Sequence, residues 1–255
     1  MKKELYITLV VLLLFLINSC SKKDNPTEPA DNGTPSADVW DSFTYPQFDY
    51  VDEDSTGSGT HLVYYIPKPD TLLKSITLTD CKVLYHDPSE VTKLSKVHLV
   101  MTTFDGVAYT TGEGNEKTIT FSNSYLTQVV NSRDKKGVIA EIKGVIAHEL
   151  THVWQKSCEY QNDGWSAVEG VADAVRYLSG NDNISRRHKG GSWTDGYTTT
   201  GFFICWLQDN KDKDFLYKLN QFMGKHYYFK WEEATQGLLN GSVQTFWDQY
   251  QAAIN

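Results

Sequence analysis

The chain has 255 residues, with 24 Lys and Arg against 32 Asp and Glu, and a formal net charge of −8. It has no basic run of the kind that binds nucleic acid, so the composition argues against a nucleic-acid partner. Neither G-x-G-x-x-G nor G-x-S-x-G occurs in the sequence, so a dinucleotide site and a serine hydrolase both lack support.

Two N-terminal segments are expected to lie outside the folded domain. A positively charged start precedes an apolar run from 5 to 17, and Leu16-Ile-Asn-Ser-Cys20 resembles a bacterial lipobox. Residues 1–20 are therefore predicted to be a lipoprotein signal peptide, with lipid on Cys20, and an ordinary signal peptide is the alternative. Residues 21–38 are polar and contain three prolines, as flexible tethers do. We expect an exported protein, lipid-anchored to a bacterial cell membrane and periplasmic or surface-facing.

The remaining residues are enough for one domain with a substantial core. Strand patterns come first, rich in β-branched and apolar residues. They fall at 61–66, 82–85, 97–102 and 117–122. From residue 136 onward the apolar spacing is helical. The predicted helices are 136–155, 163–178, 215–223, 231–239 and 243–254. This order indicates an α+β fold.

The most specific motif is His148-Glu149-Leu-Thr-His152, which lies within the helical pattern 136–155. On a helix, positions four apart share a face, so both imidazoles can bind one metal ion while Glu149 lies beside it. The alternative is a helix whose histidines are satisfied by local hydrogen bonds. The helix is largely apolar, and two unpaired histidines with a glutamate inside it would be costly. The spacing therefore predicts His148 and His152 as metal ligands and Glu149 as a general base.

A catalytic zinc site needs a third protein ligand and one open position. The next helical pattern contains Glu169, seventeen residues after His152, and Asp173 one turn later. This E-x-x-x-D spacing after H-E-x-x-H resembles the gluzincin class, which includes thermolysin. The resemblance implies that Glu169 is the third ligand and that Asp173 orients a histidine ligand. Asp173 as the ligand, as in the aspzincins, stays open as the alternative.

A longer stretch resembles one particular family. Residues Gly144–Gln155 and Val168–Asp173 closely resemble the plant basic secretory protein family, which is assigned to the peptidases. That family has His-Glu-x-Thr-His-x-Trp-Gln, then Glu-Gly-x-Ala-Asp, then a Trp/Asp/Gly/Tyr segment, here Trp193–Tyr197. The closing segment 246–250 resembles its Leu-Trp-x-x-Tyr pattern. The chain departs from the family where Asp does not directly follow the tryptophan, and at Phe202, where the family often has Arg.

The resemblance covers residues 39–255 and implies a zincin-like metallopeptidase domain. An N-terminal mixed β-sheet lobe and a C-terminal helical lobe would flank the active-site helix. The expected metal ion is Zn²⁺, because its catalytic sites use His and Glu ligands. Other divalent ions could occupy the same ligand set. The expected reaction is hydrolysis of a peptide bond in a protein or peptide substrate, glycosylated or not, with Glu149 taking a proton from water.

Two further site features are expected. Many zincins hold the oxyanion with a Tyr or a His, and Tyr197 is the candidate here, with His188 as the runner-up. The strand at 117–122 is expected to be the edge strand beside the cleft, where its free backbone groups could pair with an extended peptide. A simple hairpin strand is the alternative. Trp154 and Gln155 are expected to pack and cap the metal-binding helix.

Two other functions stay open beside the peptidase. One is a zinc hydrolase acting on glycosylated protein or peptidoglycan, with Trp165 and Trp193 binding the carbohydrate. The other is a non-catalytic, metal-containing surface-binding lipoprotein, against which Glu149 counts because a structural site needs no base. The oligomeric state is left unassigned.

The cysteines outside the signal peptide are Cys81, Cys158 and Cys205. An odd number allows at most one internal disulfide. Cys158 and Cys205 both lie in the helical half, so they are the pair expected if a disulfide forms.

Overall fold

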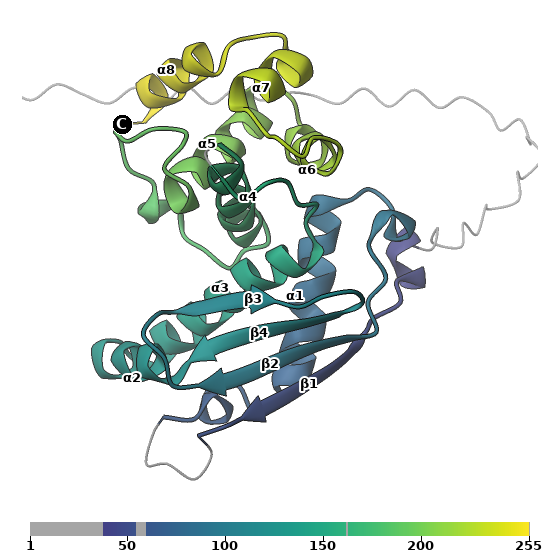
Figure 1. Ribbon diagram of the computed structural model, residues 1–255. Coiled ribbons are helices and arrows are strands. Elements are labelled where there is room, and N and C mark those ends of the chain that lie inside the picture. Colours follow the sequence, from purple (N-terminus) through teal and green to yellow (C-terminus); the bar gives the residue numbers. More distant parts are fainter. Residues whose placement is uncertain (1–37, 55–59, 162, 255) are drawn as a thin grey trace, which may run out of the picture. The chain divides into compact units, whose positions relative to one another are not determined.

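The computed structural model describes residues 38–54, 60–161 and 163–254, which carry a four-stranded sheet and eight α-helices (Figure 1). The predicted signal peptide, the lipidation site Cys20 and the tether up to residue 37 lie outside the described residues. The α+β class predicted from the sequence is confirmed.

The strands are β1 Gln47–Asp52, β2 Lys96–Thr102, β3 Ala108–Thr111 and β4 Glu116–Ser122. The helices are α1 Pro69–Leu84, α2 Asn123–Ser132, α3 Lys135–Trp154, α4 Asp163–Leu178, α5 Tyr197–Asn210, α6 Phe215–Lys225, α7 Trp231–Leu239 and α8 Val243–Ala253. Short 3₁₀ helices are η1 Val39–Ser42, η2 Leu62–Tyr64, η3 Pro88–Glu90 and η4 Ile184–Arg186.

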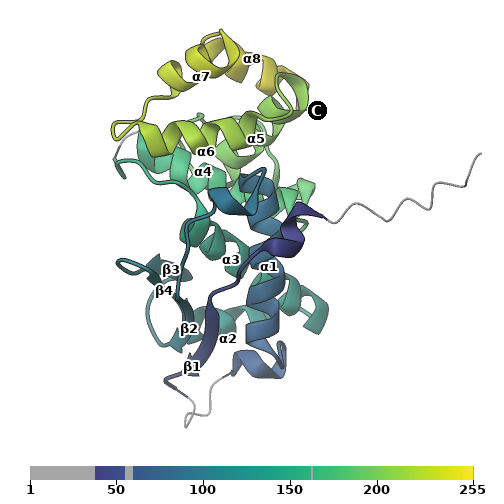
Figure 2. The same ribbon diagram turned by 90° about the vertical axis from the view of Figure 1, so that its right-hand side faces the viewer.

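The sheet is mixed and has the strand order β1-β2-β4-β3. Strands β1, β2 and β4 run parallel, and β3 pairs antiparallel with β4. In β2, Val97, Leu99 and Met101 are buried while the residues between them are partly exposed. This alternation buries one face of the sheet, which α1 and α3 cover (Figure 2).

Helix α3 is the central element of the described fold. It begins where the side chain of Asp134 accepts a hydrogen bond from the amide of Gly137. Its 20 residues span about 30 Å. The sheet layer packs on one side of its second half and α4 on the other, so every residue from Gly144 to Thr151 is buried. Polar side chains in that half of the helix therefore need hydrogen-bond partners that are themselves buried.

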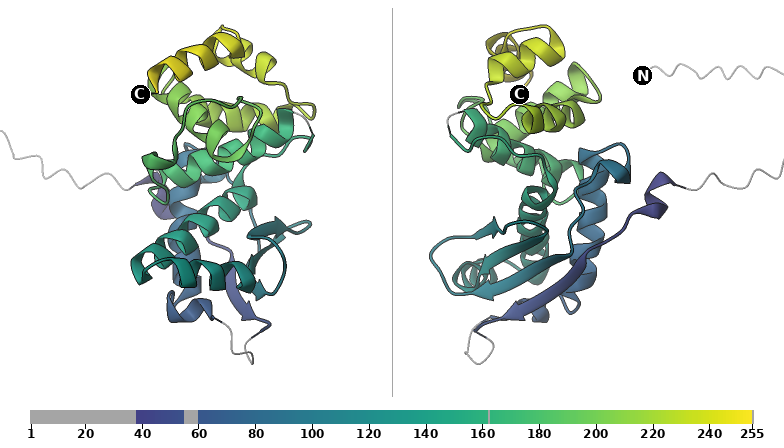
Figure 3. Two further views of the ribbon diagram at one scale, coloured as in Figure 1. Left: turned by 90° about the vertical axis from the view of Figure 1, so that its left-hand side faces the viewer. Right: turned by 45° about the vertical axis from the view of Figure 1, so that its right-hand side comes forward.

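The remaining helices, α4 to α8, gather on the side of α3 away from the sheet (Figure 1). Helices α4 and α5 make the closest helix pair. A Cβ atom on Gly201 would lie 2.9 Å from Cβ of Asp173 and 3.1 Å from the backbone nitrogen of Ala174. Gly170 on α4 faces Thr200 of α5 in the same way, so both glycines permit the approach because they have no side chain. The later helices, yellow-green to yellow in Figure 3, cover α4 and α5 from outside.

Two predicted strands are wrong. Residues 61–66 contain the 3₁₀ helix η2 instead, with Leu62 buried. Residues 82–85 are the last turn of α1 and its C-cap. Helix α1 starts with Pro69 in its first turn, a favoured position, and buries residues at helical spacing. A short apolar run inside such a helix cannot be told from a strand by its own composition.

The expectation that residues 117–122 form the edge strand is also wrong. Strand β4 lies between β2 and β3. The turn through Gly112 and Gly114 reverses the chain, and β3, which precedes this turn, becomes the outer strand. Both glycines have positive φ, 128° and 61°, which few other residues adopt without strain.

The expected disulfide between Cys158 and Cys205 does not form, because Cys81, Cys158 and Cys205 are all free and buried. Cys158 contacts the carbonyl of Gly164 at the start of α4, and Cys205 contacts that of Ala174. These carbonyls are ten residues apart on one helix, or about 15 Å. A disulfide requires Cα atoms within about 7 Å.

None of the helices in the described ranges combines the length and the apolar character that a membrane span requires.

Candidate metal centre

The two histidines of the motif face each other on one side of α3. The Nε2 atoms of His148 and His152 lie 3.1 Å apart, and the rings are nearly perpendicular. His148 is buried, with 8% of its surface exposed. One helical turn separates the two residues, so the helix itself imposes this pairing.

Glu169 on α4 completes a group of three possible ligands. Its Oε2 lies 3.1 Å from Nε2 of His148 and 3.6 Å from Nε2 of His152. One ligand atom from each residue lies within 4.8 Å of the others, so the group could bind a metal ion. Two imidazoles and a carboxylate are a ligand set of catalytic zinc sites, and the buried setting suits an ion held by protein atoms.

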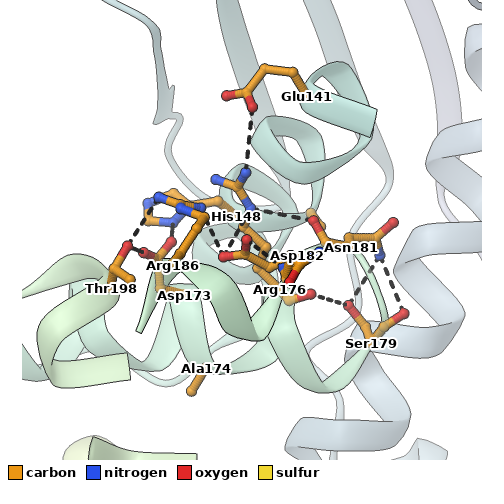
Figure 4. Close-up of polar contacts among 12 residues, drawn as sticks. Glu141, His148, Asp173, Ala174, Arg176, Ser179, Asn181, Asp182, Arg186 and Thr198 are labelled. Atoms are coloured by element: carbon orange, nitrogen blue, oxygen red, sulfur yellow. Dashed lines mark hydrogen bonds and ion pairs between the residues drawn. The ribbon is translucent and has the colours of Figure 1, made fainter. Parts of the chain in front are cut away.

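Asp173 on α4 binds the other ring nitrogen of His148. Its Oδ1 lies 2.7 Å from Nδ1 of His148, and its Oδ2 accepts a hydrogen bond from Thr198 at 2.9 Å (Figure 4). An ionised carboxylate only accepts hydrogen bonds, so Nδ1 of His148 donates. The lone pair of Nε2 is then directed at the ligand group. Asp173 thus lies behind His148, and Glu169 lies among the possible ligand atoms.

Gln155 can give His152 the same support. The nitrogen of its side-chain amide lies 2.8 Å from Nδ1 of His152, and a half-turn of the amide puts its oxygen in the same place. With the amide oxygen toward the ring, Gln155 accepts the Nδ1 proton and leaves Nε2 of His152 free to bind a metal. That orientation also gives a partner to the Gln155 amide oxygen, which is otherwise buried without one. Gln155 therefore does more than the predicted capping of α3, whose C-cap position it occupies.

The charges around the two histidines favour a cation. Burial lowers the pKa of His148, but hydrogen bonds to Asp173 and Glu169 outweigh it and raise the pKa to about 10. Burial raises the pKa of Glu169, yet hydrogen bonds from His148 and His152 hold it far below its usual range. A buried site that stabilises positive charge on imidazole this strongly also suits a positively charged ion.

Glu149 points into the same region from the neighbouring position on α3. Only 5% of its surface is exposed. The hydroxyl of Thr110, on β3, donates to Oε2 of Glu149 at 2.7 Å. This bond fixes one carboxylate oxygen and ties the outer strand of the sheet, β3, to α3.

Tyr197 lies at the site, whereas the runner-up His188 does not. The ring of Tyr197 stacks near His148, with centroids 5.9 Å apart. Tyr197 is the first residue of α5, and its φ of 41° is unusual for a residue other than glycine. Burial and nearby carboxylates raise the pKa of Tyr197, so its hydroxyl stays protonated and can donate. His188 is exposed and lies outside the cleft lining.

A cleft of about 650 Å³ contains all these groups. Its walls come from residues 107–110, the inner face of α3, one side of α4, and the start of α5. Trp165 and Trp193, the expected carbohydrate-binding residues, are not among the lining residues. Trp165 contacts Tyr197, and Trp193 packs against Trp247.

The model of one protein family, described as peptidases of plants and bacteria, matches residues 46–250. The chain belongs to this family. It is the basic secretory protein family that the sequence motifs predicted, so that prediction is confirmed. Membership makes the protein a candidate peptidase, with a possible His/His/Glu metal site. No curated protein and no solved structure matches the chain with statistical significance.

Several site residues were missed from the sequence. Tyr160, between α3 and α4, donates a hydrogen bond to Oε1 of Glu169. Thr110 and Thr198 reach the site from other elements. Nothing in their local sequence distinguishes them, because tertiary packing alone brings them there. Arg176 could have been noticed, since it follows Asp173 by three residues and is a charge on a buried helix.

Proposed function

We propose that the protein is a zinc-dependent metallopeptidase that hydrolyses peptide bonds with Glu149 as its general base. The observation that carries this proposal is the convergence of His148, His152 and Glu169 beside Glu149 on the wall of one cleft. A site built only to stabilise the fold has no need for a further buried carboxylate, Glu149, directly after the first histidine. The family match supports the same reaction class.

His148, His152 and Glu169 would hold the zinc ion, which when bound would supply a Lewis acid for the scissile carbonyl and a lower pKa for water. Glu149 supplies the base. Thr110 engages its Oε2, so Oε1 is left to accept a proton from the attacking water. The same carboxyl group can then pass that proton to the leaving amine. Asp173 keeps Nδ1 of His148 as the donor throughout.

The proposed fold is the zincin-like arrangement, with the sheet layer and the helices from α4 onward on either side of α3. Within it, β3 takes the substrate-binding role first expected for residues 117–122. Strand β3 pairs with β4 along one edge only among the described strands, and its residues 108–110 line the cleft. An extended peptide can pair with the other edge of β3 and pass the candidate ligands.

The test combines metal analysis with cleavage of a peptide library, read by mass spectrometry, on the full-length protein. We expect about one zinc per chain and chelator-sensitive cleavage. Glu149→Gln keeps the shape of the side chain but cannot take up a proton, so it should bind zinc normally and lose at least about 10²-fold in rate. Thr194→Ser, outside the cleft lining, is the matched control and should behave as wild type.

Two results would contradict the proposal. A wild-type protein that takes up no divalent metal would remove the basis of the site. Full cleavage by Glu149→Gln would exclude Glu149 as the base, even if the protein proved to be a peptidase.

A further inference from the structure

A second group of charges lies in the cleft, beside the candidate metal ligands but not among them. Arg176 on α4, Glu141 on α3 and Arg186 at the end of η4 all line the cleft. Arg176 and Arg186 both contact Asp182, and Glu141 lies on the other side of Arg176, as Figure 4 shows. The proposed reaction uses none of these residues, so their presence on the cleft wall needs another explanation.

Arg176 packs directly against α3 at Gly144, where there is no side chain to keep it away. A Cβ atom on Gly144 would lie 2.4 Å from Nη2 and 2.7 Å from Nε of Arg176. The guanidinium group therefore lies directly on the backbone at Gly144. Gly144 precedes His148 by four residues, which puts the two on one face of α3, about 6 Å apart along its axis.

The guanidinium of Arg176 has unused hydrogen-bonding capacity. Of its five N–H donors, only Nε has a hydrogen-bond partner among the described residues, the carbonyl of Asn181 at 3.5 Å. Its ion-pair distances are 3.7 Å to Asp182 and 3.9 Å to Glu141. Charge-assisted hydrogen bonds are normally about 2.7 to 2.9 Å long, so neither carboxylate is closely bound.

Both neighbouring carboxylates are bound more closely by other groups. Glu141 accepts hydrogen bonds from Arg133 at 2.6 Å and from Tyr125 at 2.7 Å. Asp182 accepts one from Arg186 at 2.8 Å. Asp173 is a third carboxylate near Arg176 and Arg186, and its two oxygens are held by His148 and Thr198. Because only 10% of the Arg176 side chain is exposed, water replaces the missing close partner of its guanidinium group poorly.

We propose that Arg176 binds a carboxylate group of the substrate. A guanidinium group offers two parallel N–H donors that match a carboxylate, and a buried one gains most from such a partner. Extended peptide advances about 3.3 Å per residue, so a group one helical turn from His148 lies one or two residues from the scissile bond. This inference rests on the proposed peptidase function and adds a substrate preference to it.

The carboxylate could belong to an acidic side chain or to the C-terminus of the peptide, and four matched peptides distinguish these sources. One is neutral with an amidated C-terminus, one neutral with a free C-terminus, one carries Glu near the cleavage site with an amidated C-terminus, and one carries Lys there instead. We expect kcat/KM for one or both carboxylate peptides to exceed that of the neutral amide about 10- to 100-fold. The Lys peptide should be the poorest substrate.

The variants are Arg176→Gln, Arg176→Lys and, as a matched control, Lys136→Gln. Lys136 is exposed at the start of α3, outside the cleft lining, so this control removes one positive charge without touching the cleft. Arg176→Gln should abolish the preference, because it lowers kcat/KM for the carboxylate peptides far more than kcat/KM for the neutral amide. Arg176→Lys keeps the charge but loses the two parallel donors, so it should retain only part of the preference for carboxylate peptides. It also keeps the inference testable if the Arg176→Gln protein does not fold.

Binding to the Glu149→Gln protein, measured by fluorescence polarisation with the same peptides, separates this inference from the proposed function. Equal kcat/KM for all four peptides, or an equal loss on all four in both Arg176 variants, would overturn the inference and leave the peptidase proposal standing. If no peptide were cut, the proposed function would fail. The binding titration would then be the only test of whether Arg176 binds a carboxylate. Weaker carboxylate-peptide binding in Arg176→Lys would support the inference, and unchanged binding would overturn it.

Discussion

Asp173 shows how much of this site depends on residues that would not touch a metal. It has no ligand atom in the group formed by His148, His152 and Glu169, yet it fixes the proton on Nδ1 of His148. It is in turn fixed by Thr198 at the start of α5. The site therefore extends from α3 through α4 to α5. A substitution of a residue that supports a candidate ligand should change the metal affinity.

The first prediction concerns this support. Asp173→Asn replaces a charged acceptor of the His148 Nδ1 proton with a neutral, weaker one and removes a buried negative charge. We expect zinc affinity to fall about 10- to 100-fold, measured by competition with a chromophoric chelator. Asp195→Asn, an exposed aspartate close in sequence to α5, is the control and should keep wild-type affinity. Equal affinity in both variants would show that Asp173 has only a packing role.

The second prediction concerns the two tyrosines of the cleft. Tyr197 stacks near His148 and keeps a protonated hydroxyl, so it is our candidate donor to the oxyanion. Tyr197→Phe should lower kcat about 10²- to 10³-fold with zinc content unchanged. Tyr160 donates to Glu169, and Tyr160→Phe should lower kcat less. Steady-state kinetics on one peptide decide the matter, and the reverse order of effects would assign the oxyanion role to Tyr160.

At the scale of elements, the site depends on how closely α4 approaches α5. Gly201 permits that approach at the level of Asp173. The third prediction is that Gly201→Ala lowers the free energy of unfolding by about 1–3 kcal/mol, because the added methyl group must push α5 away from α4. Urea denaturation measures this.

The control for Gly201→Ala is Gly237→Ala on α7. A Cβ atom there would meet nothing closer than 3.9 Å. It should stabilise the protein by about 0.5–1 kcal/mol, the usual helix-propensity gain. Destabilisation of equal size in both variants would point to a general intolerance of α-helical glycine replacement and against a specific α4–α5 contact.

The element scale also shows where sequence reasoning ends. The helix around His148 and His152 and the returning helix with Glu169 were predictable, because their spacing follows from helix geometry and their motifs. Helix α1 was missed, since its strand-like end was judged without the buried residues one and two turns earlier. The contact between Thr110 and Glu149 could not be predicted, because it joins residues 39 positions apart through the placement of β3.

At the scale of the whole molecule, one buried carboxyl group should make stability depend on pH. Asp80 on α1 is fully buried, and neither of its carboxylate oxygens has a hydrogen-bond partner among the described residues. Burial raises the pKa of this carboxyl group well above its usual range, and the nearby hydroxyl of Ser179, too poorly placed for a hydrogen bond, offsets only part of that rise. The unfolded chain ionises near pH 3.9, so the folded protein holds one more proton above that pH, and stability is lost as pH rises toward the folded pKa.

The fourth prediction follows from Asp80→Asn, which has no proton to lose. Its advantage in unfolding free energy over wild type should grow with pH, by up to about 1.4 kcal/mol per unit between the two pKa values. Urea denaturation of both proteins at several pH values between 5 and 8 gives this difference, in which all other titrating groups cancel. A difference that does not change with pH would show that Asp80 ionises in the folded protein.

The final prediction concerns metal and global stability together. The three candidate ligands come from two helices that face each other only in the folded chain, so zinc should bind the native state far better than the unfolded one. Free zinc at 1,000 times its dissociation constant should then raise the free energy of unfolding by about 4 kcal/mol, and chelation should remove that increment. Thermal unfolding at increasing zinc concentrations measures this increment.

Glu169→Ala leaves only the two histidines of α3 as ligands. Both lie on one helix whether or not α4 packs against it, so most of the increment in unfolding free energy should disappear. Zinc stabilisation that survived Glu169→Ala unchanged would mean that the metal is bound without α4, and the link between the two helices would then have to come from packing alone.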